Sequence, residues 1–526
     1  MPSYLVAVDV GTRSARAGVF DTSGRMLARA VAPLGLTEGP GPQAEYSSDQ
    51  IWDAVCAASR AVVTQAGIAP DRVIGLAFDA TCSLVLRDRD GAALSLGAPD
   101  RDTIAWFDHR ALAEAAECTA TGHRLIDHLG GAMSPEMQTP KLMWLKRHRP
   151  DAWARLGAAR DLCDELTLRA TGEPGASACA RAAKWPYLPA AGGWAEDFLA
   201  QVGLDDLRER ADLPAKVVPV GAPAGRLTPQ AARAMGLAEG IPVASGMIDA
   251  YAGALGTVGL SPGASPGLML ITGTSNCIMA VTPDPLFAPG IWGPSRDTVL
   301  PGLWTSEGGQ SAAGAALEWV LDAWPGPAPG QSYDHDAVLA RIETVLAREG
   351  AALGQEIDVL PDFNGNRSPF SDAGLRGVIA GLSLDRGFDA LCKLYWRTAV
   401  SVALGVRQIA EHLADAPSGT GTAPRSLAIA GGLARAPVLR QLFADVTGMK
   451  VLTSQAEDVV LSGTAIAAAV ASGHYPDLAT ATPAMTTLAR VLTPDPARHE
   501  CYDRDFRIML KMQDHRAEIA AMKARI

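Results

Sequence analysis

Two glycine-containing turns, each lying between two apolar runs, are the part of this chain best suited to do chemistry. One turn follows the run that starts at Tyr4, and the other follows the run that starts at Leu268. Backbone N–H groups and hydroxyls from two such turns, facing each other across a cleft, would hold nucleotide phosphates without a Walker loop. The pattern predicts an enzyme that moves a phosphoryl group. The expected phosphate-contacting residues are Gly11, Thr12, Arg13 and Ser14 in the first turn and Gly273, Thr274 and Ser275 in the second.

Two aspartates end apolar strands beside these turns. Asp9 lies just before the first turn, where its carboxylate can bind Mg²⁺ directly or through water. Asp249 follows an apolar run and precedes a helix rich in small residues, and a helix N-terminus favours its anionic form. Phosphoryl transfer to an alcohol needs a group that accepts the hydroxyl proton, so we predict Asp249 as the general base. A capping role is the alternative for each, and for Asp249 the two roles can coexist.

Two further motifs indicate sugar and nucleotide binding. The stretch Trp106–Arg110 combines an aromatic face with polar groups, among them Asp108 and His109, which suits a polyol. The start of a surface helix would look similar. Gly431 and Gly432 lie between an expected strand and helix, where glycine lets a ribose or adenine approach the backbone. Ordinary turn chemistry is the alternative.

Composition limits the other classes of function. The chain has 526 residues, which predicts two large domains, and a net charge of −11, which disfavours a nucleic-acid or membrane partner. Its eight cysteines form no CxxC pair and its histidines no HExxH motif, so we expect neither a zinc site nor disulfides. A GxxxxGK[ST] loop is also absent. With a strand expected from residue 4, no signal peptide is expected, and the protein is expected to be cytoplasmic.

The elements that must position these residues follow from periodicity. Strand, turn and strand are expected from Tyr4 and again from Leu268, which gives weak evidence of an internal duplication. Helical spacing predicts helices after Ser47 and through 111–129, 141–148 and 459–472. The Pro- and Gly-rich stretch Gly259–Gly267 is the expected domain boundary, giving domains 1–258 and 259–526.

The motifs together resemble the FGGY carbohydrate kinase family, from Tyr4 to about Gly473. In the first half the resemblance rests on Asp9-Val-Gly-Thr-Arg-Ser14, Trp106-Phe-Asp-His-Arg110 and Gly246-Met-Ile-Asp-Ala-Tyr-Ala-Gly253. In the second half it rests on the following motifs: Thr272-Gly-Thr-Ser275, Glu307-Gly-Gly-Gln-Ser311, Asn366-Arg-Ser-Pro369, Ala430-Gly-Gly-Leu433 and Leu461-Ser-Gly-Thr-Ala465. The family implies an α/β fold of two ribonuclease-H-like domains, of the actin and hexokinase type, with a catalytic cleft between them.

The resemblance also implies roles for single residues. Asp249 matches the family's catalytic base and Asp9 the carboxylate associated with Mg²⁺. Gly314, Gly431 and Gly432 match positions near the nucleotide. Lys141 and Glu307 match sugar-contacting positions of ribulose kinases, whereas residue type alone would have singled out neither. Ala436 stands where relatives often have Asn, so one adenosine contact is expected to be missing.

One stretch narrows the family to a branch. Residues 78–85, which read Phe-Asp-Ala-Thr-Cys-Ser-Leu-Val, contain a run that resembles the fingerprint of D-ribulokinases, and Ala80, Thr81 and Ser83 are expected at the sugar end of the cleft. We therefore expect ATP- and Mg²⁺-dependent phosphorylation of D-ribulose to ribulose 5-phosphate. L-ribulose, ribitol and D-xylulose are the alternative substrates, and an actin- or chaperone-like nucleotide-binding module is the non-enzymatic alternative. A homodimer is left open.

Overall fold

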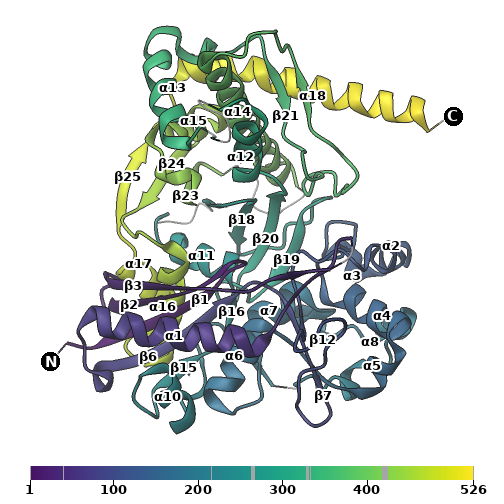
Figure 1. Cartoon of the computed structure of the whole chain (residues 1–526), viewed down its shortest axis with the longest axis vertical. Coiled ribbons are helices and arrows are strands. Elements are labelled where there is room, and N and C mark those ends of the chain that lie inside the picture. The colour runs from purple at the N-terminus through teal and green to yellow at the C-terminus, as the bar shows by residue number, and fades with distance from the viewer. Residues whose placement is uncertain are drawn as a thin grey trace.

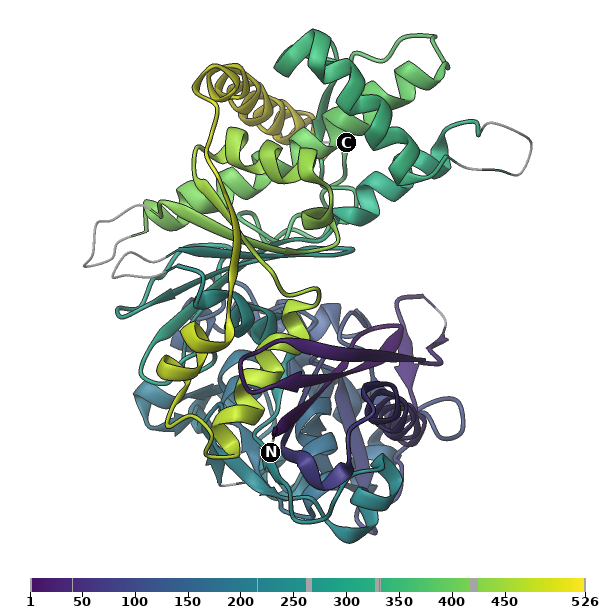
Figure 2. The same cartoon turned by 90° about the vertical axis from the view of Figure 1, so that its left-hand side faces the viewer.

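The computed structural model describes residues 2–39, 41–214, 216–261, 267–326, 331, 333–416 and 424–524. Figure 1 shows two bodies, one built mainly from the first half of the chain and one mainly from the second, and Figure 2 shows them from the side. Among the described residues no helix is both long and apolar enough to cross a membrane.

The first body is built on a seven-stranded sheet. Five of its strands lie in the order β3-β2-β1-β6-β15, with β1–β3 antiparallel to one another and β1, β6 and β15 parallel. The turn between β2 and β3 includes Gly24 at φ 89°. Buried parallel strands read as continuous apolar runs, as β1 and β6 do. The strands are β1 (Tyr4–Val10), β2 (Ser14–Asp21), β3 (Met26–Pro33), β6 (Val73–Ala80), β14 (Pro223–Arg226), β15 (Pro242–Ala244) and β16 (Met247–Ile248).

The second body repeats this order. In its seven-stranded sheet, β20-β18-β17-β23-β24 have the arrangement and polarity of β3-β2-β1-β6-β15. The repeated strand–turn–strand pattern in the sequence therefore marks a structural repeat, and the predicted pair of ribonuclease-H-like α/β domains is confirmed. The strands are β17 (Leu268–Thr272), β18 (Asn276–Thr282), β19 (Trp292–Arg296), β20 (Trp304–Gln310), β23 (Ser426–Gly431), β24 (Lys450–Ser454) and β25 (Leu488–Leu492).

Helices cover the sheets with their apolar faces. Helix α1 (Ser48–Ala66) packs on the first sheet; the hydroxyl of Ser47 caps its start and Gly67, at φ 62°, ends it, as the sequence predicts. The first half of the C-terminal helix α18 (Pro496–Lys523) buries Tyr502 and Phe506, whereas its end projects from the body (Figure 1). The other elements of the second body are α12 (Gly314–Ala323), α13 (His335–Glu349), α14 (Phe388–Ala414), α15 (Pro437–Thr447), β21 (Asp358–Leu360) and β22 (Val378–Ala380).

A long insertion between β6 and β15 contributes most of a separate five-stranded sheet to the first body. The strand order of this sheet is β4-β5-β8-β7-β9. The helix expected over 111–129 is broken at Gly122, which has φ 60°. The strands are β4 (Thr37–Glu38), β5 (Ala44–Tyr46), β7 (Leu84–Asp88), β8 (Thr103–Ile104), β9 (Leu156–Asp161), β10 (Ala176–Ser177), β11 (Tyr187–Leu188), β12 (Gly193–Trp194) and β13 (Val217–Val218). The helices that lie between β6 and β15 in the chain are α2 (Leu112–Ala120), α3 (Arg124–Asp127), α4 (Gln138–His148), α5 (Pro150–Arg155), α6 (Leu162–Thr171), α7 (Ala178–Lys184), α8 (Glu196–Gln201), α9 (Leu207–Arg210) and α10 (Pro229–Met235).

Two helices cross between the bodies. Helix α11 (Asp249–Val258) leaves the first sheet and packs against β17 and β23 of the second, whereas α16 (Val459–Ala471) packs against β1 and β6 of the first, followed by α17 (Leu478–Met485). They touch backbone to backbone, since a Cβ added to Gly463 would lie 1.8 Å from the carbonyl oxygen of Ala252. The segment that carries α16 thus belongs by packing to the first body. The division into 1–258 and 259–526 stays a prediction, and most of the expected boundary, residues 262–266, lies outside the described residues.

Candidate active site

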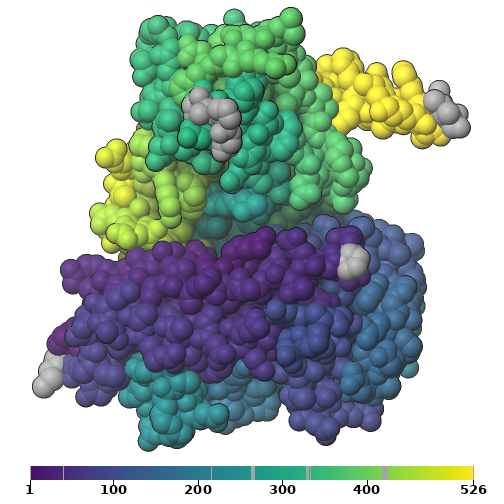
Figure 3. Space-filling model, viewed as in Figure 1, coloured from purple at the N-terminus to yellow at the C-terminus, as the bar shows by residue number. Residues whose placement is uncertain are grey.

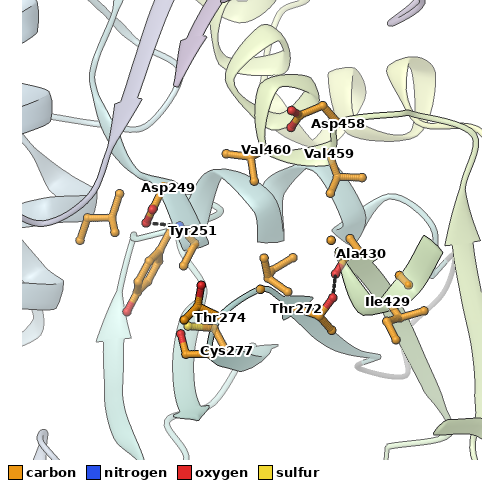
Figure 4. A pocket seen from close by; sticks show the side chains of 18 of the residues that line it. Asp249, Tyr251, Thr272, Thr274, Cys277, Ile429, Ala430, Asp458, Val459 and Val460 are labelled. Carbon is orange, nitrogen blue, oxygen red and sulfur yellow. Dashed lines mark hydrogen bonds between the residues drawn. The ribbon is translucent and has the colours of Figure 1, made fainter. Parts of the chain in front are cut away.

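A cavity of about 490 Å³ lies where the two sheets meet. Figure 3 shows the surface hollowed between the two bodies, and Figure 4 shows the lining at close range. The first half of the chain contributes Thr12, Arg16, Thr81, Cys82, Trp106, Glu136, Lys184 and Ile248–Tyr251. The second half contributes Ile271–Ser275, Cys277, Glu307, Arg367, Ile429–Gly432, Ala434, Arg435, Arg440, Thr453, Ser454 and Ala456–Val460. The two predicted turns therefore share one cavity.

Buried carboxylates lie beneath the first-half side of the cavity. Asp9 is fully buried and forms an ion pair with Arg16, its cross-strand partner on β2. Asp79 lies beside it in register on β6 and accepts a hydrogen bond from the hydroxyl of Thr464 on α16. Burial raises the pKa of Asp9 to about 7, although the charge of Arg16 opposes this shift. This corner places two buried acidic side chains and one cation at the end of two parallel strands.

Asp249 lines the cavity at the first residue of α11. Its Oδ1 accepts the backbone N–H of Ala250 at 2.7 Å, which fixes the carboxylate at the helix start. Burial raises its pKa, while that N–H, Arg16 and Lys184 act in the opposite direction. A carboxylate that faces a cavity with a raised pKa is suited to accept a proton from a bound hydroxyl.

The second-half turn is held from behind by a helix. The N–H groups of Ala313 and Gly314 donate to the carbonyls of Thr274 and Gly273 at 2.9 and 3.0 Å. These bonds fix the turn from behind, while the Gly273 N–H donates to the Ser275 carbonyl at 2.8 Å, so the hydroxyls and the N–H groups of Thr274 and Ser275 are the groups that the turn can offer to the cavity. Gly314 does not line the cavity, and a Cβ there would lie 2.6 Å from the Gly273 oxygen. The structure places it as the support of the turn.

The two glycines after β23 have different surroundings. Gly431 has φ 98°, and a Cβ on it would lie 1.9 Å from the carbonyl oxygen of Thr272. A Cβ on Gly432 would meet no atom of the described residues within 4 Å. Backbone geometry therefore requires glycine only at Gly431, whereas Gly432 leaves open space at the cavity wall.

Charged side chains of both signs gather at another part of the lining. Arg367 forms an ion pair with Glu307 and lies 3.9 Å from the ring centroid of Trp292. The ammonium of Lys184 lies 4.3 Å from the same centroid. Glu136 lies 3.5 Å from Nε2 of His109. Two cations and two carboxylates therefore line this region, and their formal charges sum to zero.

The sequence-predicted sugar residues are not all brought to the cavity. Lys141 is fully buried, and its ammonium donates to the carbonyls of Ala105 and Trp106 at 3.0 and 3.2 Å. Lys184 is the lysine that lines the cavity. Asp108 is also buried, and its carboxylate binds the N–H of Ala44 and the guanidinium of Arg110. Oδ2 accepts from the Ala44 N–H and from one guanidinium nitrogen, and Oδ1 accepts from the backbone N–H and Nε of Arg110. Asp108 therefore braces the loop rather than lining the cavity.

The ribulokinase-like stretch and the first turn reach the cavity only in part. Thr81 lines it, and its hydroxyl lies 3.0 Å from that of Ser83, which is fully buried together with Ala80. In the first turn only Thr12 lines the cavity; its hydroxyl accepts a hydrogen bond from the indole of Trp106 at 3.1 Å. The other three turn residues, Gly11, Arg13 and Ser14, do not line the cavity. Arg13 is exposed, and its guanidinium lies 3.6 Å from the carboxylate of Glu38.

Sequence reasoning missed several lining residues. Arg16 could have been found, because the register of a hairpin around Gly11–Ser14 places it opposite Asp9. Arg367 lies in a quoted motif but carried no expected role. Lys184 and Glu136 gave no signal, because the helices and loops that carry them belong to the insertion, whose packing no local pattern predicts.

This arrangement, two sheets of one topology with a shared cavity between them, defines a bilobal α/β protein with a binding cavity between its lobes. Comparison with known proteins narrows the class. The family model for the N-terminal domain of FGGY carbohydrate kinases matches residues 4–256, and the C-terminal model matches 268–472. The chain belongs to the FGGY family of carbohydrate kinases, and it is a carbohydrate kinase.

Individual relatives support the same family. The chain is 37% identical to the human FGGY carbohydrate kinase domain-containing protein, over 99% of this chain and 98% of the relative. It is 33% identical to the D-ribulokinase YDR109C of Saccharomyces cerevisiae, over 90% of this chain and 72% of that protein. Among solved structures, the xylulose kinase from Rhodospirillum rubrum superposes with a TM-score of 0.80 at 25% identity, covering 98% of this chain and 99% of that one.

Proposed function

We propose that this kinase transfers the γ-phosphoryl group of ATP to the terminal hydroxyl of D-ribulose, giving D-ribulose 5-phosphate. The observation that carries the proposal is the single cavity in which Asp249 and four charge-balanced side chains meet. The four side chains are Lys184, Arg367, Glu136 and Glu307. A balanced set of donors and acceptors suits a neutral polyhydroxy compound, because an acidic sugar would leave the carboxylates repelling it. The resemblance to a D-ribulokinase supports this substrate.

Each side of the cavity has a distinct part in the proposed reaction. Lys184 and Glu307 bind substrate hydroxyls as donor and acceptor, and Asp249 accepts the proton of the attacking hydroxyl. The turn Gly273–Ser275 and the pair Gly431–Gly432 hold the nucleotide. Because both domains contribute to the cavity, binding of sugar and nucleotide orients the two reactants and excludes water from the transferring group.

Mg²⁺ fits beside Asp9. Its buried carboxylate faces the guanidinium of Arg16 and the carboxyl of Asp79, and among the described residues no backbone N–H donates to either oxygen. Oxygen ligands of this kind are those that Mg²⁺ prefers. Asp9 would hold the ion directly or through water, and the ion would neutralise charge on the nucleotide phosphates.

A screen of ADP release tests the substrate. D-ribulose, L-ribulose, D-xylulose and ribitol are each added with ATP and Mg²⁺, and the highest kcat/KM is expected with D-ribulose. The similarity to ribulokinases at 26–28% identity and to a xylulose kinase keeps the other pentuloses in the comparison. A higher kcat/KM with any of the other three compounds would overturn the assignment to D-ribulose.

A further inference from the structure

Glu307 is bound on both of its carboxylate oxygens by residues from different parts of the chain. Its Oε2 accepts the phenolic hydroxyl of Tyr251 at 3.0 Å. Its Oε1 forms the ion pair with Arg367 and lies 3.6 Å from the thiol of Cys277. Burial acts to raise the pKa of Glu307, but the charges of Arg367 and Lys184 outweigh it and leave the pKa lowered. Glu307 is therefore an ionised acceptor held in one orientation.

Tyr251 connects this carboxylate to the proposed base. It lies two residues after Asp249 in the first turn of α11, and Figure 4 shows both side chains on the same side of the pocket. Glu307 lies on β20 of the second sheet, so the hydrogen bond joins the helix that starts with Asp249 to a strand of the sheet on which this helix packs. Tyr251 is 3% exposed, and burial together with Glu307 raises its pKa well above the usual value, so the hydroxyl stays a donor.

The bond leaves room for a ligand. A carboxylate oxygen has two lone-pair positions, and Tyr251 is the one donor to Oε2 among the described residues. The second position can accept a substrate hydroxyl. Because Tyr251 is anchored next to Asp249, the direction in which Oε2 presents that position is set relative to the base.

We infer that Tyr251 is a positioning residue whose hydroxyl holds Glu307 in the orientation that places the bound sugar's reacting hydroxyl beside Asp249. The inference rests on the proposed function, since it names a determinant of sugar placement in that same site. The alternative is that Tyr251 only fills the core, for which its ring is sufficient and its hydroxyl is not needed.

Removing the hydroxyl alone separates the two roles. Tyr251→Phe keeps the ring, and kcat/KM for the preferred sugar is expected to fall roughly 10- to 100-fold, the scale of one hydrogen bond to a charged group. KM for ATP is expected to stay nearly unchanged. Tyr475→Phe is the matched control, because it removes a hydroxyl that donates to the carbonyl of Thr22 at 2.9 Å, and neither residue lines the cavity. A Tyr251→Phe enzyme as active as the Tyr475→Phe control would overturn the inference.

A double-mutant cycle tests whether Tyr251 acts through Glu307. In a Glu307→Gln background, adding Tyr251→Phe is expected to lower kcat/KM by less than about threefold further. Because the Gln side chain can still accept the hydrogen bond, the same measurement is made in a Glu307→Met background. Independent, multiplying losses would contradict the inference. The same double-mutant cycle, measured by thermal unfolding, detects the hydrogen bond without any need for turnover. Absence of coupling in that measurement overturns the inference, whichever sugar is the substrate. Absence of activity with all four sugars in the wild type overturns only the proposed function.

Discussion

The two turns that face the cavity come from the same topology but have opposite chemistry. In the first sheet, Asp9 is paired in register with Arg16 on one neighbouring strand and with Asp79 on the other. At the matching end of the second sheet, Thr272 is paired with Asn276 and Gly431. The first end is charged and buried, whereas the second carries no formal charge and offers hydroxyls and glycine backbone. A charged end suits proton and cation handling, and an uncharged end receives an anionic nucleotide without competing carboxylates.

The largest expected effect is at the charged end. Asp249→Asn keeps the shape and the contact with the Ala250 N–H but removes the base, so turnover should fall by about 10²–10⁴-fold. Initial rates of ADP release measure this, with sugar affinity followed separately. Asp53→Asn, at an exposed position on α1, is the control. Full turnover in a folded Asp249→Asn enzyme would remove Asp249 from the mechanism.

Two lysines in the insertion sharpen the comparison further. Lys184→Met should lower kcat/KM for the sugar roughly 10- to 100-fold, because a charged donor to the substrate is lost. Lys141→Met should mainly lower the melting temperature, because two buried carbonyls lose their donor. Steady-state kinetics and thermal melts on both variants test the assignment. The opposite outcome, a catalytic loss at Lys141 with an active Lys184 variant, would return the sugar contact to Lys141.

The charged end should also set the acid side of the pH profile. Burial raises the pKa of Asp249 above its ordinary value of 3.8, so the protonated, inactive form should accumulate at a higher pH than for an exposed Asp. Below this raised pKa, kcat/KM should fall about tenfold for each pH unit, and it should level off above it. Profiles of the wild type and the Asp249→Asn variant are compared. If the fall of kcat/KM at low pH is unchanged in the variant, the titrating group is not Asp249.

The smallest effects are expected at the uncharged end. Gly431→Ala places a methyl group against the Thr272 carbonyl at a positive φ, so a loss of unfolding free energy of about 1 kcal/mol or more is expected. Gly432→Ala meets no atom of the described chain and should fold normally, while raising KM for ATP if the nucleotide approaches that face. Denaturant melts and ATP titrations measure the two. Equal stability of both variants would show that the turn relaxes.

The sequence predicts the frame of the site better than its contents. Strand–turn–strand runs from Tyr4 and Leu268 are set by local periodicity, and they place Thr12 and Thr274 in the cavity. Lys184 was not predictable, because which of two lysines reaches the cavity depends on how α4 and α7 pack in the insertion. That α11 packs on the second sheet and α16 on the first was also not predictable. Helices made of small residues have no pronounced apolar face that would indicate which sheet they cover, and a short chain segment can return to either sheet.

The glycine contact between α11 and α16 has a mechanical consequence. A Cβ on Gly256 would lie 2.1 Å from the carbonyl of Val459, and Gly463 is as close to Ala252. The two helices are thus in close backbone contact over about one helical turn, and each is also packed on the opposite sheet. Sliding would drive backbone into backbone, so the low-cost relative motion is rotation about this crossing. We expect relative motion of the two bodies to pivot at this crossing, so that a small turn there gives a larger displacement at the mouth of the cavity.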